Sequence, residues 1–63
     1  MDMNKYVGEK VSITTDDGLN ICGEVALVGY DEESDRDYLL IDVVKYFEQL
    51  YEEDISSIEI IEN

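Results

Sequence analysis

The stretch that most constrains the fold is 11–30, VSITTDDGLNICGEVALVGY, in which two strand-like segments flank Asp17-Gly18. Gly18 tolerates a positive φ and an aspartate before it tolerates the left-handed region, so this pair predicts a tight hairpin turn. Apolar and polar residues alternate on both sides of the turn, which is typical of strands with one buried face. The sequence therefore predicts a β-hairpin of strands 11–15 and 19–30.

The second strand of this hairpin is long, and it contains a glycine. Five of its residues share one phase of the alternation and so are expected on one face: Leu19, Ile21, Gly23, Val25 and Leu27. A glycine inside a strand often marks a bend or a close backbone approach. We expect Gly23 to bend the strand so that it serves two faces of a barrel.

Before the hairpin, Asp2 or Asn4 could cap a single helical turn that ends at Gly8. Tyr6 and Val7 would then lie over one end of the barrel. After the hairpin, the pattern predicts an exposed, mobile acidic loop and then four further elements. The predicted segments are the loop 31–37, a strand 38–44, a strand 46–52, a 3₁₀ turn 53–55 and a strand 56–61.

The segment 43–51 allows two interpretations, because Phe47, Leu50 and Tyr51 also stand at helical spacing. Its β-branched and aromatic residues favour a strand, with a turn near Lys45. Five strands in 63 residues are too few for a sandwich. The prediction is one domain, 1–63, all-β, folded as a small five-stranded barrel whose closure removes most free strand edges.

The charge of the chain limits its partners. Seventeen acidic residues against four basic ones give a net charge of −13. Nucleic acids and anionic membranes are bound largely through lysine and arginine, so this charge disfavours both. A basic protein surface is the expected partner, although acidity can also serve solubility alone. One cysteine, no histidine and no recognisable signal peptide predict a cytoplasmic protein without a disulfide or an ordinary zinc site.

Residues 5–61 resemble the Sm-like (LSm) family. The first half shares a valine-led strand, Asp17-Gly18, Gly23 and an acid at Asp31, and 38–42, YLLID, resembles the family's third strand. The segment 51–61, YEEDISSIEII, resembles its closing part, with Ile55 and Ile58 as barrel anchors.

The resemblance implies a small, strongly bent five-stranded barrel of the SH3-like or Sm-like kind. Such barrels often form rings through their fourth and fifth strands, and many members of the Sm-like family bind RNA. This chain departs from the RNA-binding pattern. Arg36-Asp37-Tyr38 stands where the family has its base-contacting asparagine, and Glu52-Glu53 replaces its Arg-Gly pair. Carboxylates on that rim would repel phosphate.

No enzyme chemistry is predicted. Cys22 has no histidine to activate it, and a barrel this small leaves little room for a substrate pocket. Asp31, Glu33, Asp35 and Asp37 have the spacing of oxygen ligands, but Arg36 occupies the place of the glycine that a calcium loop needs. We therefore predict no cofactor and no metal site, and a solvated acidic loop.

The candidate interaction surface consists of four tyrosines: Tyr30, Tyr38, Tyr46 and Tyr51. They could form a stacking or peptide-binding face, or they could cover barrel rims with buried rings and solvated hydroxyls. The leading hypothesis is a non-catalytic module that binds protein and could self-associate through strands 46–51 and 56–61. The alternatives are a divergent Sm-like RNA-binding protein and an acidic nucleic-acid mimic that blocks a basic groove.

Overall fold

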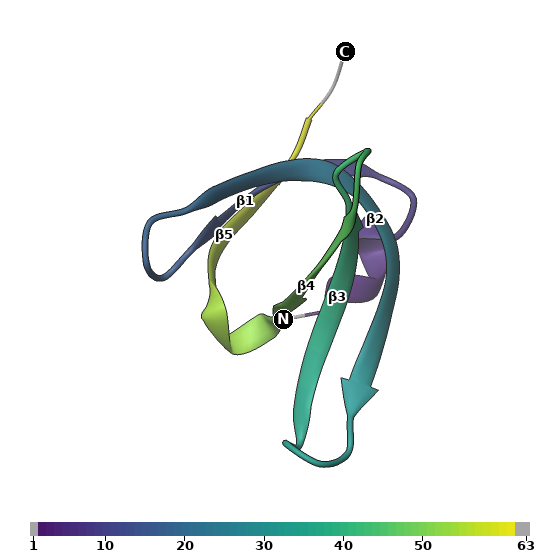
Figure 1. Cartoon of the computed structure of the whole chain (residues 1–63), viewed down its shortest axis with the longest axis vertical. Coiled ribbons are helices and arrows are strands. Elements are labelled where there is room, and N and C mark those ends of the chain that lie inside the picture. Colours follow the sequence, from purple (N-terminus) through teal and green to yellow (C-terminus); the bar gives the residue numbers. More distant parts are fainter. Residues whose placement is uncertain (1, 62–63) are drawn as a thin grey trace.

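The computed structural model describes residues 2–61 and is all-β, with a single five-stranded antiparallel sheet in the order β4-β3-β2-β1-β5 (Figure 1). The elements are η1 (Met3–Tyr6), β1 (Lys10–Thr15), β2 (Asn20–Asp31), β3 (Arg36–Asp42), β4 (Phe47–Tyr51), η2 (Glu52–Asp54) and β5 (Ile55–Ile60). The sheet is strongly bent, and β2 arches across the molecule to join its two halves (Figure 1). The predicted fold class, including the helical turn at the start and the 3₁₀ turn before the last strand, is confirmed.

The turn between β1 and β2 forms where Asp17-Gly18 predicts it. The backbone N–H of Thr15 donates to the carbonyl of Leu19 at 2.9 Å, and the N–H of Gly18 donates to the carbonyl of Thr15 at 3.0 Å. Gly18 has a φ of +89°, which glycine adopts without strain. The Thr15 hydroxyl also donates to the Asp17 carboxylate, and this bond is the main cause that lowers the pKa of Asp17 below 3.8.

Gly23 lies where β2 passes close to the end of β3. A Cβ at this position would overlap the carbonyl oxygen of Asp42. Of the two roles that a glycine inside a strand often has, the structure thus shows the close backbone approach at Gly23.

A β-bulge at Ala26 reverses the faces of the second half of β2. Val25 and Leu27 pair with consecutive residues of β3, so Ala26 is the extra residue. Val25 is fully buried, Leu27 is 43% exposed, and Val28 packs against the core in its place. The prediction that Leu27 shares the face of Val25 is wrong, because an inserted residue shifts a two-residue alternation by one.

The core fills the inside of the bend. Its buried residues are Met3, Tyr6, Val11, Ile13, Val25, Leu39, Ile41, Leu50 and Ile55. Ile21, Val28, Val43 and Ile58 pack against them and are partly buried. The two isoleucines that the resemblance marks as barrel anchors, Ile55 and Ile58, thus both contact the core.

The N-terminal turn is capped as predicted, since the Asp2 carboxylate accepts from the backbone N–H of Asn4 at 3.0 Å. Tyr6 is buried, but Val7 is 46% exposed. The prediction that both residues cover the barrel is therefore right only for Tyr6. Val7 ends the helical turn with an extended ψ, before the reversal at Gly8, whose φ is +84°.

The segment 47–51 is a strand, as the β-branched and aromatic residues favour, and the helical alternative is wrong. The chain turns just before it, where the N–H of Val43 donates to the carbonyl of Tyr46 at 3.0 Å. Tyr46 therefore belongs to the turn rather than to the strand. Val44 in this turn has a φ of +80°, which is unusual for a β-branched residue.

The sheet is not closed, which corrects the expectation that barrel closure removes the strand edges. Within residues 2–61, β4 pairs with β3 alone and β5 with β1 alone, so each is an edge strand. η2 turns the chain between them, and the N–H of Asp16 donates to the carbonyl of Asp54 at 2.9 Å. This bond holds the end of η2 against the β1–β2 turn, so that β5 pairs beside β1 rather than beside β4.

Candidate functional site

Arg36, at the start of β3, is held by two contacts with later parts of the chain. Its guanidinium carbon lies 3.6 Å from the centre of the Tyr51 ring. Its Nη1 donates to the Glu53 carboxylate at 2.8 Å, and this bond is the main cause that raises the pKa of Arg36. The one arginine of the chain is thus engaged within the molecule.

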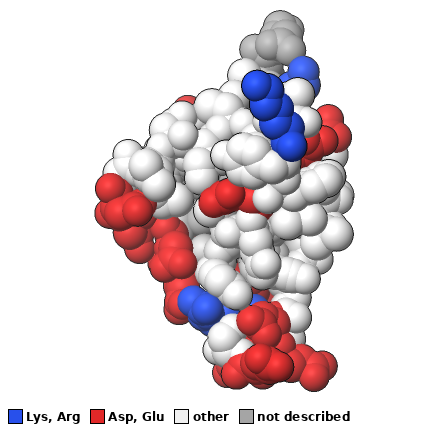
Figure 2. Space-filling view, viewed as in Figure 1, with Lys and Arg blue, Asp and Glu red and all other residues white. Residues whose placement is uncertain are grey.

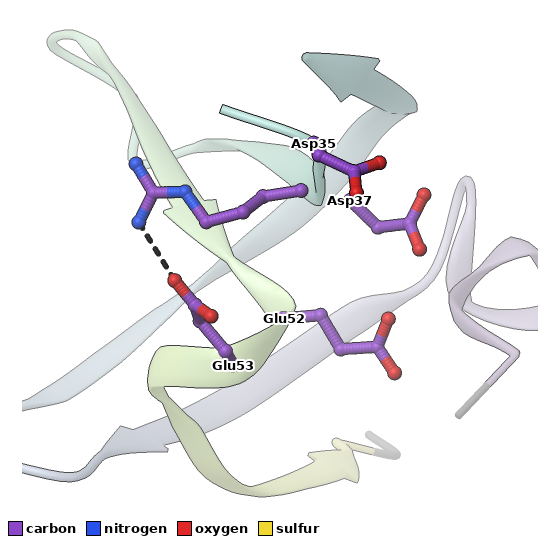
Figure 3. Close-up of a pocket in the computed structure, with 5 residues that line it drawn as sticks. Asp35, Asp37, Glu52 and Glu53 are labelled. Atoms are coloured by element: carbon purple, nitrogen blue, oxygen red, sulfur yellow. Dashed lines mark hydrogen bonds and ion pairs between the residues drawn. The ribbon is translucent and has the colours of Figure 1, made fainter. Parts of the chain in front are cut away.

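Beside this pair is an open hollow of about 370 Å³ lined by Asp35, Arg36, Asp37, Glu52 and Glu53. Figure 3 shows the Arg36–Glu53 ion pair on one side. The carboxylates of Asp35, Asp37 and Glu52 point to the other side (Figure 3). Carboxylates accept charge-assisted hydrogen bonds from lysine and arginine, so this arrangement suits a cationic group.

The loop between β2 and β3 is shorter than predicted, because Asp31, Arg36 and Asp37 belong to the strands. Asp31 organises it: its carboxylate accepts from the Ser34 hydroxyl at 2.9 Å and from the backbone N–H of Glu33 at 3.1 Å. These bonds hold the pKa of Asp31 below 3.8, and the bond from the Ser34 hydroxyl is the largest cause. In residues 2–61, no cluster of acidic and cysteine side chains is close enough to hold a metal ion.

Two of the four predicted tyrosines lie together. Tyr38 and Tyr51 are opposite each other on β3 and β4, with ring centres 6.4 Å apart and ring planes inclined by 28°. The Tyr38 ring covers Gly29, and the Tyr51 hydroxyl donates to the Asp31 carboxylate at 3.2 Å. Of this pair, Tyr51 is the ring on which Arg36 stacks.

The other two tyrosines lie elsewhere. Tyr30 follows Gly29 on β2, so it points to the face opposite Tyr38. Its hydroxyl donates to the Asp35 carboxylate, which is the main cause that raises the pKa of Tyr30 above 10.0. Tyr46 is 59% exposed in the β3–β4 turn. The four residues do not form one continuous face.

A second groove, which the sequence did not suggest, runs between β4 and the β1–β2 turn. Its volume is about 420 Å³. It is lined by Thr15, Asp16, Asp17, Leu19, Ile21, Glu48, Leu50 and Asp54. The phase that Glu48 and Leu50 share along β4 was the available signal. This signal indicates a groove only if β4 and β5 do not pair with each other, as is the case here.

The opposite end of the molecule is more apolar. Val44 is 92% exposed, and Tyr46 and Phe47 are each 59% exposed. Val44 also lines a shallow depression of about 380 Å³ with Lys10, Cys22, Gly23, Glu24, Asp42 and Ile61. Cys22 is exposed, and its thiol contacts the side-chain oxygen of Asn20 at 3.4 Å.

Charge is unevenly distributed over the surface. Figure 2 shows acidic side chains running from the left edge of the view, where Figure 1 places the β1–β2 turn, to the lower end, where Figure 1 places the β2–β3 turn. We call this surface, with Asp16, Asp17, Glu52, Glu53, Asp54, Asp35 and Asp37, the acidic band. Basic side chains lie at the upper end, with acidic side chains beside them on the right (Figure 2).

No helix in the described residues is long and apolar enough to cross a membrane. No protein-family model, curated protein or solved structure matches this chain.

Proposed function

We propose that this protein is a non-catalytic interaction module whose acidic band binds a basic surface of another protein. The observation that carries the proposal is the band itself, which extends from the β1–β2 turn across η2 to the β2–β3 turn. Oppositely charged surfaces steer association and set its specificity. A lysine- or arginine-rich surface is the complement of this one.

The geometry of the hollow supports the same partner. Asp35, Asp37 and Glu52 present their carboxylates on one side (Figure 3). The only arginine nearby stacks on Tyr51 and pairs with Glu53, so it is committed within the molecule. An RNA phosphate at this rim would meet carboxylates, which disfavours the RNA-binding alternative. An acidic mimic that blocks a nucleic-acid groove would be one form of the proposed module.

A non-catalytic role is supported by the side chains available. The chain has no histidine, and the contact of Cys22 is with Asn20, which is not a base. The hollows are open and shallow rather than enclosed. We also propose kinship with Sm-like barrels, which the bent five-stranded sheet and the 3₁₀ turn before β5 support.

Self-association is a second candidate, supported by the two edge strands β4 and β5. An unpaired edge is a template for another strand. Light scattering at high salt, where repulsion between copies is screened, tests it. A dimer or ring would support this second candidate, and a monomer at high protein concentration would remove it.

The main proposal is tested by fluorescence anisotropy with two labelled probes, an arginine- and lysine-rich peptide and a single-stranded RNA of equal length. We expect the peptide to bind and the RNA not to bind. Peptide affinity should fall as salt is raised from about 0.05 to 0.5 M, because screening weakens exposed charge pairs.

Two triple variants separate a site from net charge. The first, Asp35→Asn, Asp37→Asn and Glu52→Gln, neutralises one side of the hollow. The second, Glu9→Gln, Glu24→Gln and Glu59→Gln, removes the same charge from exposed positions outside the acidic band. The first triple should weaken peptide binding more than the second. Equal losses in the two triples, or binding of RNA in preference to peptide, would contradict the proposal.

A further inference from the structure

The groove between β4 and the β1–β2 turn combines an apolar floor with an acidic rim. Leu50 is buried on β4, Ile21 packs against the core, and Leu19 is 60% exposed at the groove. The rim carries four carboxylates: Asp16, Asp17, Glu48 and Asp54. Apolar surface beside clustered like charge is suited to a ligand that carries both apolar groups and the opposite charge.

The backbone of β4 is also unpaired on one side. Val43 and Tyr46 form a hydrogen-bonded pair at the turn, and in an antiparallel ladder such pairs alternate. Glu48 and Leu50, in register with Ile41 and Leu39, therefore direct their backbone groups toward β3. The N–H and C=O groups of the intervening residues, Phe47, Gln49 and Tyr51, point outward. In the part of the chain that the structure describes, β3 is the one strand hydrogen-bonded to β4.

Charge decides which strand could occupy this edge. Glu48 lies two residues from Leu50, so both side chains face the groove. A strand paired with β4 would place one residue opposite Glu48 and another opposite Leu50, two positions apart. A second copy would offer β5, which carries Glu59 and has no basic residue. Carboxylates on facing strands repel, whereas a lysine or arginine opposite Glu48 is stabilising.

We propose that an extended segment of a basic protein partner adds to the free edge of β4. The segment carries a lysine or arginine opposite Glu48 and an apolar residue two positions away, opposite Leu50. Backbone hydrogen bonds to Phe47, Gln49 and Tyr51 supply affinity, and the two groove-facing side chains supply specificity, as in other strand-addition complexes. This site rests on the proposed function, since it lies at one end of the acidic band.

Two peptides of identical composition test the spacing. One repeats Val-Thr-Lys-Thr, which puts valine and lysine on the same face of a strand. The other repeats Val-Lys-Thr-Thr, which puts them on opposite faces. The first should bind more tightly. A third peptide has the Val-Thr-Lys-Thr sequence with its threonine amides N-methylated, which blocks the edge that would pair with β4. It should bind more weakly, and this test requires no change to the protein.

Hydrogen exchange followed by NMR locates the bound peptide. In the free protein, the amides of Phe47, Gln49 and Tyr51 should exchange fast and those of Glu48 and Leu50 slowly. On binding the first peptide, the fast set should become protected. Glu48→Gln should weaken binding by about twofold to fivefold. The control Glu59→Gln, on β5, should change it less.

The remaining outcomes overturn the proposed site. Binding without protection of the outward β4 amides would place the peptide elsewhere in the acidic band and leave the proposed function standing. The amides of Ile58 and Ile60 point outward from β5, because hydrogen-bonded pairs alternate along β5 from the Ile61–Lys10 bond. Protection of these two amides instead would place the peptide on β5. Equal affinity for the two peptides, no binding of either, or pairing of β4 with a second copy would each exclude the site as described.

Discussion

Arg36 shows how one side chain can set the character of a surface. Its guanidinium stacks on the Tyr51 ring and donates to Glu53, so its charge is paired within the molecule. Arg36 therefore pairs with Glu53 and not with Asp35 or Asp37, which line the same hollow. Arginine suits this position better than lysine, because a planar guanidinium can stack and donate at the same time.

Thr15 and Asp17 give a pH prediction at the residue scale. The Thr15 hydroxyl lowers the pKa of Asp17, and a lowered carboxyl pKa stabilises the fold at pH values above the unfolded value of 3.8. That contribution is lost as the pH falls through the folded pKa. In Thr15→Val, the pKa of Asp17 should therefore rise toward 3.8, as measured by NMR titration of its carboxyl carbon.

The control for this titration is Thr14→Val, which leaves the Thr15–Asp17 bond in place. Asp17 should titrate there as it does in the parent protein. If Asp17 titrates identically in Thr15→Val and in the parent, the hydroxyl does not govern its ionisation.

At the scale of elements, the bulge in β2 decides which residues stabilise the core. Val28 packs against the core, whereas Leu27 is 43% exposed. Val28→Ala should therefore cost about 1–2 kcal/mol in the free energy of unfolding. Leu27→Ala should cost less, although it removes a larger side chain. Urea unfolding of both variants measures the difference, and a larger loss for Leu27→Ala would mean that the bulge is absent.

The same bulge marks the limit of prediction from the sequence. The hairpin could be predicted because Asp17-Gly18 and the alternation around it are local signals. Ala26 carries no local mark of an inserted residue, and its effect appears only in the pairing with β3. The contacts of the candidate site also lack a local signal in the sequence. Arg36 meets Glu53, and Tyr51 meets Asp31, across 17 and 20 positions of the chain.

The groove between β4 and the β1–β2 turn could not be predicted for a related reason. Closure was expected because closing a sheet removes its edges. The bond from Asp16 to Asp54 and the turn at η2 place β5 beside β1 and leave β4 unpaired. Glu48 and Leu50 share a face of β4, and this face lines a groove because β5 lies beside β1. No local sequence pattern encodes that position of β5.

At the scale of the whole molecule, a net charge of −13 on 63 residues destabilises the compact state by self-repulsion. The screening length falls from about 30 Å at 0.01 M salt to about 3 Å at 1 M. The melting temperature should therefore rise with sodium chloride, by about 4–8 °C for each 1 kcal/mol of repulsion removed. Circular dichroism measures it. Tetramethylammonium chloride should act alike, and a melting temperature that falls with salt would contradict the repulsion.

The concentration of acidic side chains in the acidic band has a kinetic consequence (Figure 2). It gives the molecule an electric dipole in addition to its net charge. Within the Debye length, the field of a basic partner turns the acidic band toward that partner before contact. With the basic partner proposed above, encounters would begin in a favourable orientation, and the uneven surface would raise the rate of association beyond what net charge alone provides.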